Sequence, residues 1–409
     1  MSVPVWVWGQ SVLWALAHVY LWARLVRGTT SPGSAARRAG TAVAMVLATF
    51  IPASLITPFF FGLAVSGAIA WPGNIWYGLA IYLLILLLLA EPVRLVAAVV
   101  RRRRAKKRDI VPDLEGRAFL VHSIAVTTGA AARDAVPDPA RRVFLARSIA
   151  VTAGATASGL VGYGMVNALG PPHLDRVTVR LRRGGPKAGG LRIALVGDIH
   201  LGPMLGRAHT RRIVDMINGT GADLVAIVGD LVDGTVEQLA SAAAPLRDLR
   251  SRHGTFFVTG NHEYLSGAAE WIEELRELGV RPLRNERVEL PALDLAGVND
   301  VTGAQQDDGP DYAQALGDRD PSRPVVLLAH QPVQVNEAAH YGVDLQLSGH
   351  THGGQFVPMN LITSLAQPTL AGYGRFGGTQ LYVTKGAGFW GPPVRVGAPP
   401  DITIVELAI

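Results

Sequence analysis

The chain has 409 residues, of which 49% are hydrophobic and 17% charged, so it is too long for one ordinary domain and too apolar for a wholly soluble enzyme. The net charge of +6 suggests a nucleic-acid partner, but the block from Arg101 to Arg108 alone holds seven basic residues directly after an apolar run, which is typical of a cytoplasmic membrane flank. The sequence contains no cysteine, so disulfides and thiolate metal sites are excluded, and any metal site must use oxygen and imidazole ligands.

Three apolar segments near the start of the chain are each long enough to cross a bilayer as a helix: roughly 3–26, 41–69 and 75–100. Arginines lie between the first two segments and after the third, whereas the turn at 71–74 carries no charge. The positive-inside rule therefore predicts that the N-terminus lies outside and residue 101 inside. We expect residues 1–108 to form three transmembrane helices with a basic cytoplasmic flank.

A duplicated hydrophobic segment occupies residues 109–170, where the stretch from Arg117 to Ala130 returns with few changes from Arg142 to Ala155. The second copy continues apolar to Leu169, which is long enough for a fourth membrane span. The first copy is cut short by the following Arg133, Asp134 and Pro137, so we expect a short interfacial or cytoplasmic helix there. A fourth span would place everything after Pro171 on the outer face.

Arg141 and Arg142, followed by Val-Phe-Leu, also resemble the core of a twin-arginine export signal. Ala140 and Ala146 stand where such signals usually carry other residues, and the pair lies far from the N-terminus. Whether this signal is used stays open, but export by this route would also place the following domain outside.

From Val177 onward, short runs rich in β-branched residues alternate with stretches of helical spacing. Such alternation predicts an α/β domain in which helices cover the sheets. The expected strands are 191–196, 224–228, 255–258, 325–329, 343–347, 381–384 and 402–407, and the expected helices are 207–218, 236–250, 268–278 and 334–341.

Five polar motifs follow these expected strands, each at the point where a strand ends and where α/β folds build their sites. Residues two apart in an extended chain project to the same side, so Asp198 with His200, and His350 with His352, can each converge on one point. Singly, each motif has an ordinary explanation as a turn or a satisfied polar residue, but five of the eleven histidines fall in this ordered set. The motifs are Gly197-Asp-Ile-His200, Gly229-Asp-Leu-Val-Asp233, Gly260-Asn-His-Glu263, Ala329-His330 and Gly349-His-Thr-His352.

This ordered set resembles the calcineurin-like metallophosphoesterase family, whose pattern is Asp-x-His, Gly-Asp-x-x-Asp, Gly-Asn-His-Asp/Glu, His and Gly-His-x-His. The stretch from Ser348 to Gln355 and the tail from Lys385 to Asp401 resemble the membrane-associated branch of that family. The resemblance covers about 191–407. It implies a catalytic domain at 171–409 with a four-layer α/β/β/α sandwich, preceded by an all-α transmembrane region.

The resemblance also implies a dinuclear metal centre and assigns its ligands by position. Imidazole, carboxylate and amide ligands suit Mn, Fe or Zn better than Ca or Mg, and the identity of the two divalent ions stays open. His262 occupies the position of the catalytic proton donor to the leaving oxygen, and Asp233 and Glu263 are expected to orient imidazoles rather than to bind metal. The implied ligands are Asp198, His200, Asp230 and His352 for the first metal, and Asp230, Asn261, His330 and His350 for the second, with Asp230 as the bridge.

These features predict a membrane-anchored enzyme that hydrolyses a phosphodiester or a phosphomonoester with a metal-bridging hydroxide. Two divalent ions, two carboxylates and a hydroxide leave about one positive charge, which attracts an anionic phosphate. Phosphodiesters are slightly favoured, because a proton donor at His262 helps a poor leaving group most. The expected partners are a phosphoester substrate and the bilayer, with a lipid- or nucleotide-linked substrate as one hypothesis, while the oligomeric state stays open.

Two alternatives of other kinds remain. A membrane transporter or receptor with a regulatory, phosphoesterase-like sensor domain is disfavoured, because the expected spans contain almost no charge beyond Glu91. A metal-dependent nuclease would need a basic, aromatic-studded groove, for which Arg207, Arg211 and Arg212 are the available basic residues. The expected location is the cell membrane, with several spans and the catalytic domain on the extracytoplasmic face.

Overall fold

The structure is a computed structural model that describes residues 5–96, 99–100, 139–181 and 190–408. The basic block and the first copy of the duplicated segment lie outside the described residues. The chain divides into two compact units. One comprises 1–7, 50–78 and 160–409, and the other comprises 8–49 and 79–159, so each is considered by itself.

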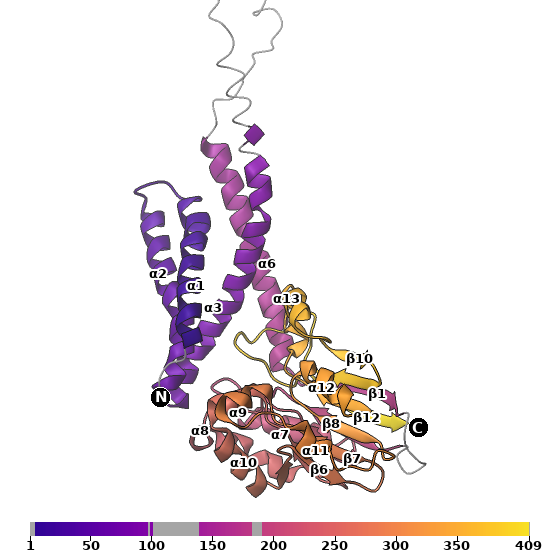
Figure 1. Cartoon of the computed structure of the whole chain (residues 1–409). Helices are drawn as coiled ribbons and strands as arrows, with labels where there is room; N and C mark the ends of the chain where they lie inside the picture. The colour runs from indigo at the N-terminus through magenta and orange to yellow at the C-terminus, as the bar shows by residue number, and fades with distance from the viewer. Residues whose placement is uncertain (1–4, 97–98, 101–138, 182–189, 409) are drawn as a thin grey trace, which may run out of the picture. The chain divides into compact units, whose positions relative to one another are not determined.

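The N-terminal part is helical, as expected for an all-α membrane region (Figure 1). Three described helices are long and apolar enough to cross a membrane, namely Ala35–Phe59, Leu63–Val96 and Arg142–Leu169. The first helix of the chain is not one of these three, so the number of spans stays a prediction. The helices are α1 (Val5–Trp22) with a π-helical turn at Ala23–Arg27, α2 (Ala35–Ile56) with a 3₁₀ turn at Thr57–Phe59, α3 (Leu63–Leu89) and α6 (Pro139–Leu169).

The expected turn at 71–74 is wrong, because α3 begins at Leu63 and runs through Pro72 without a break. Proline inside a membrane helix removes one backbone hydrogen bond but does not force a turn. The turn between α2 and α3 instead lies at 60–62.

Glu91, the acidic residue expected in the third span, is ion-paired and hydrogen-bonded. Its carboxylate accepts hydrogen bonds from Tyr20 Oη at 2.8 Å, from Arg24 Nη2 at 2.9 Å and from Arg94 Nη1 at 2.8 Å. A paired carboxylate of this kind joins helices and does not by itself mark a transport pathway.

Two six-stranded mixed sheets form the C-terminal domain. Parallel pairing dominates both sheets, with antiparallel pairs at β12–β2 in the first and at β10–β11 and β6–β7 in the second. In spatial order the first sheet contains β1 (His173–Arg180), β12 (Asp401–Ala408), β2 (Arg192–Val196), β3 (Leu224–Ile227), β4 (Thr255–Phe257) and β5 (Val280–Pro282), and the second contains β10 (Gly372–Phe376), β11 (Thr379–Val383), β9 (Leu345–Ser348), β8 (Val325–Leu328), β7 (Asp294–Gly297) and β6 (Glu286–Glu289).

Helices cover the outer faces of these sheets. The helices of the domain are α7 (Arg207–Asn218), α8 (Val236–Ala243), α9 (Asn261–Ser266), α10 (Ala268–Glu277), α11 (Tyr312–Leu316), α12 (Val335–His340) and α13 (Met359–Ala366).

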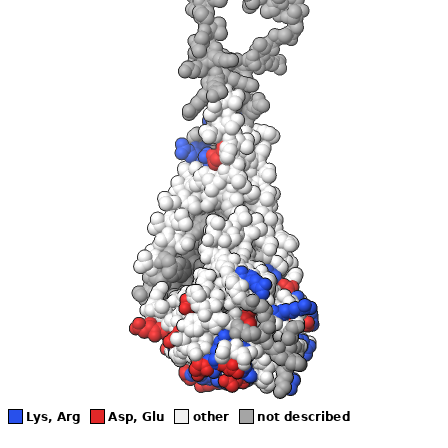
Figure 2. All heavy atoms as spheres, turned by 45° about the vertical axis from the view of Figure 1, so that its right-hand side comes forward, with Lys and Arg blue, Asp and Glu red and all other residues white. Residues whose placement is uncertain are grey.

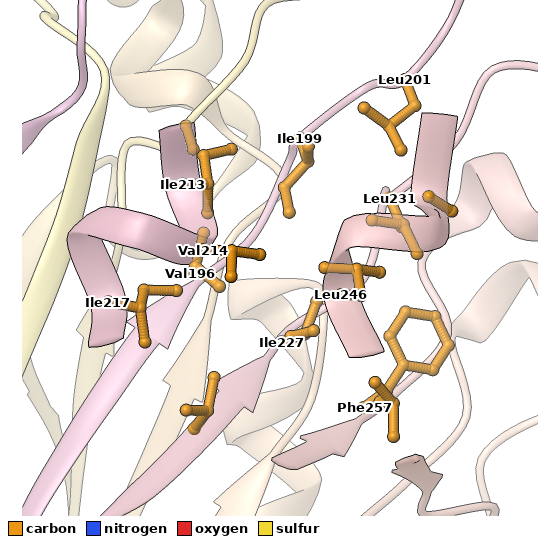
Figure 3. Packing of buried hydrophobic residues seen from close by; sticks show 14 of the residues in the cluster. Val196, Ile199, Leu201, Ile213, Val214, Ile217, Ile227, Leu231, Leu246 and Phe257 are labelled. Atoms are coloured by element: carbon orange, nitrogen blue, oxygen red, sulfur yellow. The ribbon is translucent and has the colours of Figure 1, made fainter. Parts of the chain in front are cut away.

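Three buried hydrophobic clusters define the layers. The central cluster joins the inner faces of both sheets, for example Leu195 of β2 with Val326 of β8. A second cluster packs α7, α8 and α10 on the first sheet, and Figure 3 shows Ile213 and Ile217 of α7 over Val196 and Ile227. A third cluster packs α11 and α12 on the second sheet. The layers therefore run helix, sheet, sheet, helix, which confirms the predicted α/β/β/α sandwich.

Candidate metal centre

The predicted ligands all follow the carboxyl ends of parallel strands. The first sheet supplies Asp198 and His200 after β2, Asp230 after β3 and Asn261 after β4, and the second sheet supplies His330 after β8 and His350 and His352 after β9. Because the two sheets are stacked, these strand ends meet along one edge of the sandwich. The structure thus brings all seven predicted ligands together.

Five of these seven residues have a backbone conformation that non-glycine residues rarely adopt. Their φ angles are positive: 51° for Asp198, 52° for His200, 50° for Asp230, 72° for His350 and 52° for His352. Such strained residues persist only where the surrounding structure holds them, and they cluster at functional sites. The strain turns each side chain away from its strand and into the common space between the loops.

The first group of candidate ligands contains Asp198, His200 and His352, whose donor atoms lie within 4.8 Å of one another. The two imidazoles face each other through their Nε2 atoms at 3.0 Å, and Nε2 of His352 lies 3.6 Å from Oδ1 of Asp198. All three residues are buried. Two imidazole nitrogens and a carboxylate that converge in this way make a natural cation site.

The second group contains Asp230, His330 and His350. His330 Nε2 lies 3.2 Å from Asp230 Oδ2, 3.2 Å from Asn261 Oδ1 and 3.2 Å from His350 Nδ1. On the other side of its ring, Nδ1 of His330 donates to the carbonyl of Val228 at 2.7 Å, which leaves Nε2 directed at the site.

Asp230 lies between the two groups. Its Oδ1 accepts a hydrogen bond from the backbone N–H of His262 at 2.9 Å, so this oxygen is fixed. Its Oδ2 is 3.2 Å from Nε2 of His330 and 3.9 Å from Nε2 of His200. One oxygen atom is therefore within reach of both groups, as a bridging ligand requires.

Asp198 supplies the clearest test of whether a metal fits. Its Oδ2 is buried and has no hydrogen-bond partner, although buried carboxylate oxygens normally have one. Burial raises the pKa of this carboxyl to about 6, with a further contribution from the carboxylate of Asp230. A divalent ion would satisfy the oxygen and restore the carboxylate, so the residues fit a metal centre.

Asp233 binds two imidazoles, as the sequence predicted for an orienting residue. Its Oδ1 lies 2.9 Å from Nδ1 of His200 and 2.7 Å from Nδ1 of His262. Burial alone would raise the pKa of Asp233, but the two imidazoles hold it well below its usual value. The carboxylate is thus ionised and fixes the tautomer of both rings, leaving each Nε2 toward the site.

His262 lies beside this centre with its Nε2 4.0 Å from Asp230 Oδ2. Burial lowers the pKa of the imidazole, but the carboxylates of Asp230 and Asp233 outweigh that effect and raise it to about 9. The side chain is 14% exposed, so the ring is held yet reachable.

Glu263 was expected to orient an imidazole, but the hydrogen bonds that its carboxylate accepts within the described part of the chain all come from backbone N–H groups. Its carboxylate accepts hydrogen bonds from the backbone N–H groups of Gly260 at 2.6 Å, Asp230 at 3.0 Å and Leu231 at 2.8 Å. Because α9 begins immediately before it, the side chain can turn back to the start of its own helix and also reach the loop after β3. Glu263 therefore positions the backbone of Asp230 rather than a ring.

Two residues near the centre had no predicted role. Arg395 is fully buried, and its guanidinium donates to the carbonyl of His352 at 2.8 Å and lies 2.9 Å from Nδ1 of that ring. Trp390 is 44% exposed, with its ring centroid 5.8 Å from that of His262. Arg395 belonged to a tail that resembled the family, but nothing in that motif indicated its partner.

The three arginines that were considered for a nuclease groove each bind another group of the domain. Arg207 donates to the carbonyl of Ser241, and Arg211 pairs with Asp248 at 2.7 Å. Arg212 donates to the carbonyl of Leu169, the last residue of α6. These contacts use the side chains within the domain and leave no support for a nucleic-acid groove at this position.

The sequence of the chain is similar to those of known proteins. The model for calcineurin-like phosphoesterases matches residues 191–354. A protein of Helicobacter pylori (strain J99) named as an uncharacterized metallophosphoesterase is 41% identical over 254 residues, which cover 61% of this chain and 68% of that protein. A Bos taurus transmembrane protein with metallophosphoesterase domain is 40% identical, over 59% of this chain and 58% of its own length. The crystal structure of calcineurin-like phosphoesterase YfkN from Bacillus subtilis is 15% identical, with a TM-score of 0.34, and the match covers 48% of this chain and 82% of YfkN.

Proposed function

The chain belongs to the calcineurin-like metallophosphoesterase family, and on that premise we propose that it is a membrane-anchored enzyme that hydrolyses a phosphodiester at the centre formed by Asp198, Asp230 and their histidine neighbours. The family makes the chain a metal-dependent hydrolase of phosphoric esters. The anchoring is supported by the helices long enough to span a membrane and by the transmembrane relatives.

One observation carries the proposal: two groups of donor atoms share the carboxylate of Asp230. Its Oδ2 is within 3.2 Å of His330 and 3.9 Å of His200. We assign Asp198, His200 and His352 to one ion, and Asn261, His330 and His350 to the other, with Asp230 common to both. When bound, two divalent ions would supply Lewis acidity toward the phosphoryl oxygens and an activated water.

The preference for a phosphodiester follows from His262. A diester leaves as an alkoxide, which is a poor leaving group until it receives a proton. His262 is held by Asp233 through Nδ1 at 2.7 Å, so its Nε2 is the atom that can deliver a proton. The carboxylate of Asp233 at this distance favours the protonated ring. The ring can therefore act as general acid without moving.

The location remains a proposal that follows from the sequence. Four candidate spans with arginines at 24–38 and 101–108 would place the domain after Leu169 on the extracytoplasmic face. The ion pairs of Glu91 weigh against a transport pathway through the helices that contain them. The phosphoesterase domain is thus proposed as the working part and the helices as its anchor.

The test is metal content and turnover of the purified full-length protein in detergent, with a chromogenic phosphodiester and a chromogenic phosphomonoester. We expect about two metal equivalents and metal-dependent hydrolysis of the diester. His262→Ala should keep both metals and lose about 10²- to 10⁴-fold in rate, the usual contribution of a general acid. Asp230→Asn should lose metal as well as rate.

His340→Ala is the matched control, because that histidine is exposed on α12 and should change nothing. A wild-type protein that folds but binds no metal would refute the ligand assignment. Equal loss of metal in His262→Ala and Asp230→Asn would refute the separate role given to His262.

A further inference from the structure

The helix α13 carries an apolar surface that no other described part of the domain covers. Leu361 is 64% exposed, Ile362 60% and Leu365 88%, and Val357 just before the helix is 44% exposed. None of the residues of α13 is buried. Large aliphatic side chains gathered in this way on a surface mark an interaction site.

The segment around this helix is also uncharged. No Asp, Glu, Lys or Arg occurs from Gly353 to Gly374, although the rest of the domain is rich in them. Figure 2 shows charged side chains spread over the visible face of the domain. A helix that faced only water would gain solubility from charges, so this composition fits burial in an apolar medium.

The start of this helix is linked to the end of α6, one of the helices able to span a membrane, through Arg395 and Val396. The backbone N–H of Arg395 donates to the carbonyl of Gly164 at 2.9 Å, and Asn167 donates to the carbonyl of Arg395 at 3.2 Å. The next residue, Val396, pairs with Phe356 and accepts from the N–H of Val357 at 3.1 Å. Figure 1 shows α13 on the side of the domain that α6 enters.

The depth of α6 sets the depth of α13. A helix needs about 20 residues to cross the hydrocarbon core, and α6 extends for 31 residues from Pro139 to Leu169. If Arg142 and Arg147 stay at one surface, the helix leaves the core close to Gly164. The contacts of Arg395 and Val396 hold the start of α13 at this level.

The same helix rests on the metal centre. Its first turn packs against the 3₁₀ turn His352–Gly354, where a Cβ on Gly354 would lie 2.3 Å from Cα of Asn360. His352 is one of the assigned ligands. An α13 immersed in the membrane surface therefore holds the turn that carries His352 at the level of the lipid head groups.

We propose that α13 inserts its aliphatic face into the membrane that α6 spans, and that the substrate is a phosphodiester carried by a lipid of that membrane. The proposal of a lipid substrate rests on the proposed function, whereas the proposal that α13 inserts into the membrane does not. Because α6 tethers the domain, α13 needs no basic residues of its own to reach the surface. The apolar contact then fixes the orientation of the domain over the lipid.

Insertion is measured with a nitroxide on a single cysteine, which is unique because the natural chain has none. Leu365→Cys and the control Glu273→Cys, whose side chain is 69% exposed on α10, are labelled in the full-length protein. The protein is placed in nanodiscs of phosphatidylcholine and phosphatidylglycerol. We expect the label at 365 to be accessible to oxygen and shielded from a water-soluble nickel chelate, and the label at 273 to behave in the opposite way. Equal exposure of both labels to the chelate would overturn the proposal.

Delivery of substrate is measured in the same nanodiscs with Leu365→Asp, alone and with Leu361→Asp. We expect turnover of phosphatidylglycerol to fall at least tenfold, while turnover of a soluble chromogenic phosphodiester stays unchanged. If neither of these turnovers falls although the nitroxide label shows insertion, the proposal of a lipid substrate is wrong. If the wild-type protein turns over neither substrate, the proposed function fails, and the nitroxide result still decides insertion.

Discussion

Arg395 is a buried residue that is not itself a metal ligand but whose removal should destabilise the phosphoesterase domain. Its guanidinium donates to the carbonyls of His352, Lys385 and Gly388 at 2.8, 2.9 and 3.1 Å. We expect Arg395→Met to cost about 3 kcal/mol or more, since each buried carbonyl left without a donor costs about 1–3 kcal/mol. Thermal unfolding of the full-length protein measures this loss.

Arg395→Lys is the matched variant for that experiment. Lysine keeps the charge but cannot present several donors in a planar fork, so it should recover only part of the stability. A full recovery by lysine would show that the charge matters and the fork does not.

His209 makes the domain sensitive to acid. It is buried on α7, its Nε2 has no hydrogen-bond partner, and burial together with Arg212 lowers its pKa to about 4. The unfolded chain, with an ordinary histidine pKa, then binds more protons than the folded one, so stability falls as pH drops from about 6.5 to about 4. The loss amounts to at most about 3 kcal/mol.

His209→Leu should remove this part of the acid destabilisation, and His340→Leu should not, because His340 is exposed. Unfolding temperatures of both variants, taken at pH 7 and pH 4.5, test the assignment. Parallel pH dependence in wild type and His209→Leu would contradict it.

At the scale of single residues, the sequence predicted the candidate ligands and missed the residues that support them. Asp198 and His350 could be found because strand-end motifs place them at one edge of the fold. Arg395 and Trp390 lie in a loop whose path depends on packing against distant segments, so no local pattern indicates their partners. Glu263 was found, but its hydrogen bonds to backbone N–H groups depend on the close approach of two loops.

Among the elements, those that pack a periodic hydrophobic face were predicted well. The helix expected at 207–218 agrees with α7, and the strand expected at 224–228 agrees with β3 to within one residue. The strands β5, β6 and β7 were not predicted, because each has only three or four residues and forms mainly through its neighbour in the sheet. The helix α13 was missed because its aliphatic face does not pack on a core.

The loop between β4 and α9 depends on one glycine. A Cβ on Gly260 would lie 2.2 Å from Oδ1 of Asp230 and 2.4 Å from its backbone nitrogen. Gly260→Ala should therefore displace Asp230, with loss of both metals and of activity. Metal analysis after purification provides the measurement.

Gly206→Ala is the control for this substitution. Gly206 precedes α7, its φ of −122° suits any residue, and no atom lies within 4 Å of an added Cβ. It should keep metal and activity. Retention of two metals by Gly260→Ala would show that the loop can yield and that the close approach is not required.

For the whole molecule, the metal centre should also stabilise the fold. Without a cation, Asp198 and Asp230 are buried carboxylates near each other, and a ligand that binds only the folded state adds about 2.7 kcal/mol at a hundred times its Kd. Chelation should thus lower the unfolding temperature of the phosphoesterase domain by several degrees. Asp230→Asn should show little further change on chelation. If the chelator does not change the unfolding temperature, the prediction that a metal centre stabilises the fold is wrong.

In the membrane region, the helices could be predicted from the sequence but the exact start of α3 could not. Hydropathy indicated apolar helices, and the structure contains them, but the start of α3 at Leu63 was not predicted because an uncharged turn and an uncharged helix have the same composition. The orientation in the membrane stays a prediction, since it depends on the placement of arginines between the spans.

The strand β12 has a consequence for the order of events during synthesis. It lies between β1 and β2, and the side chain of Asp401 at its start accepts hydrogen bonds from Thr384 and Lys385. The ribosome makes β12 after every other strand of both sheets. Until then, β1 and β2 lack the strand that pairs with both of them. If the domain is exported across the bilayer, as proposed, it must either cross in an incomplete state or wait until β12 has been made. A route that exports only finished domains could not act until β12 had left the ribosome.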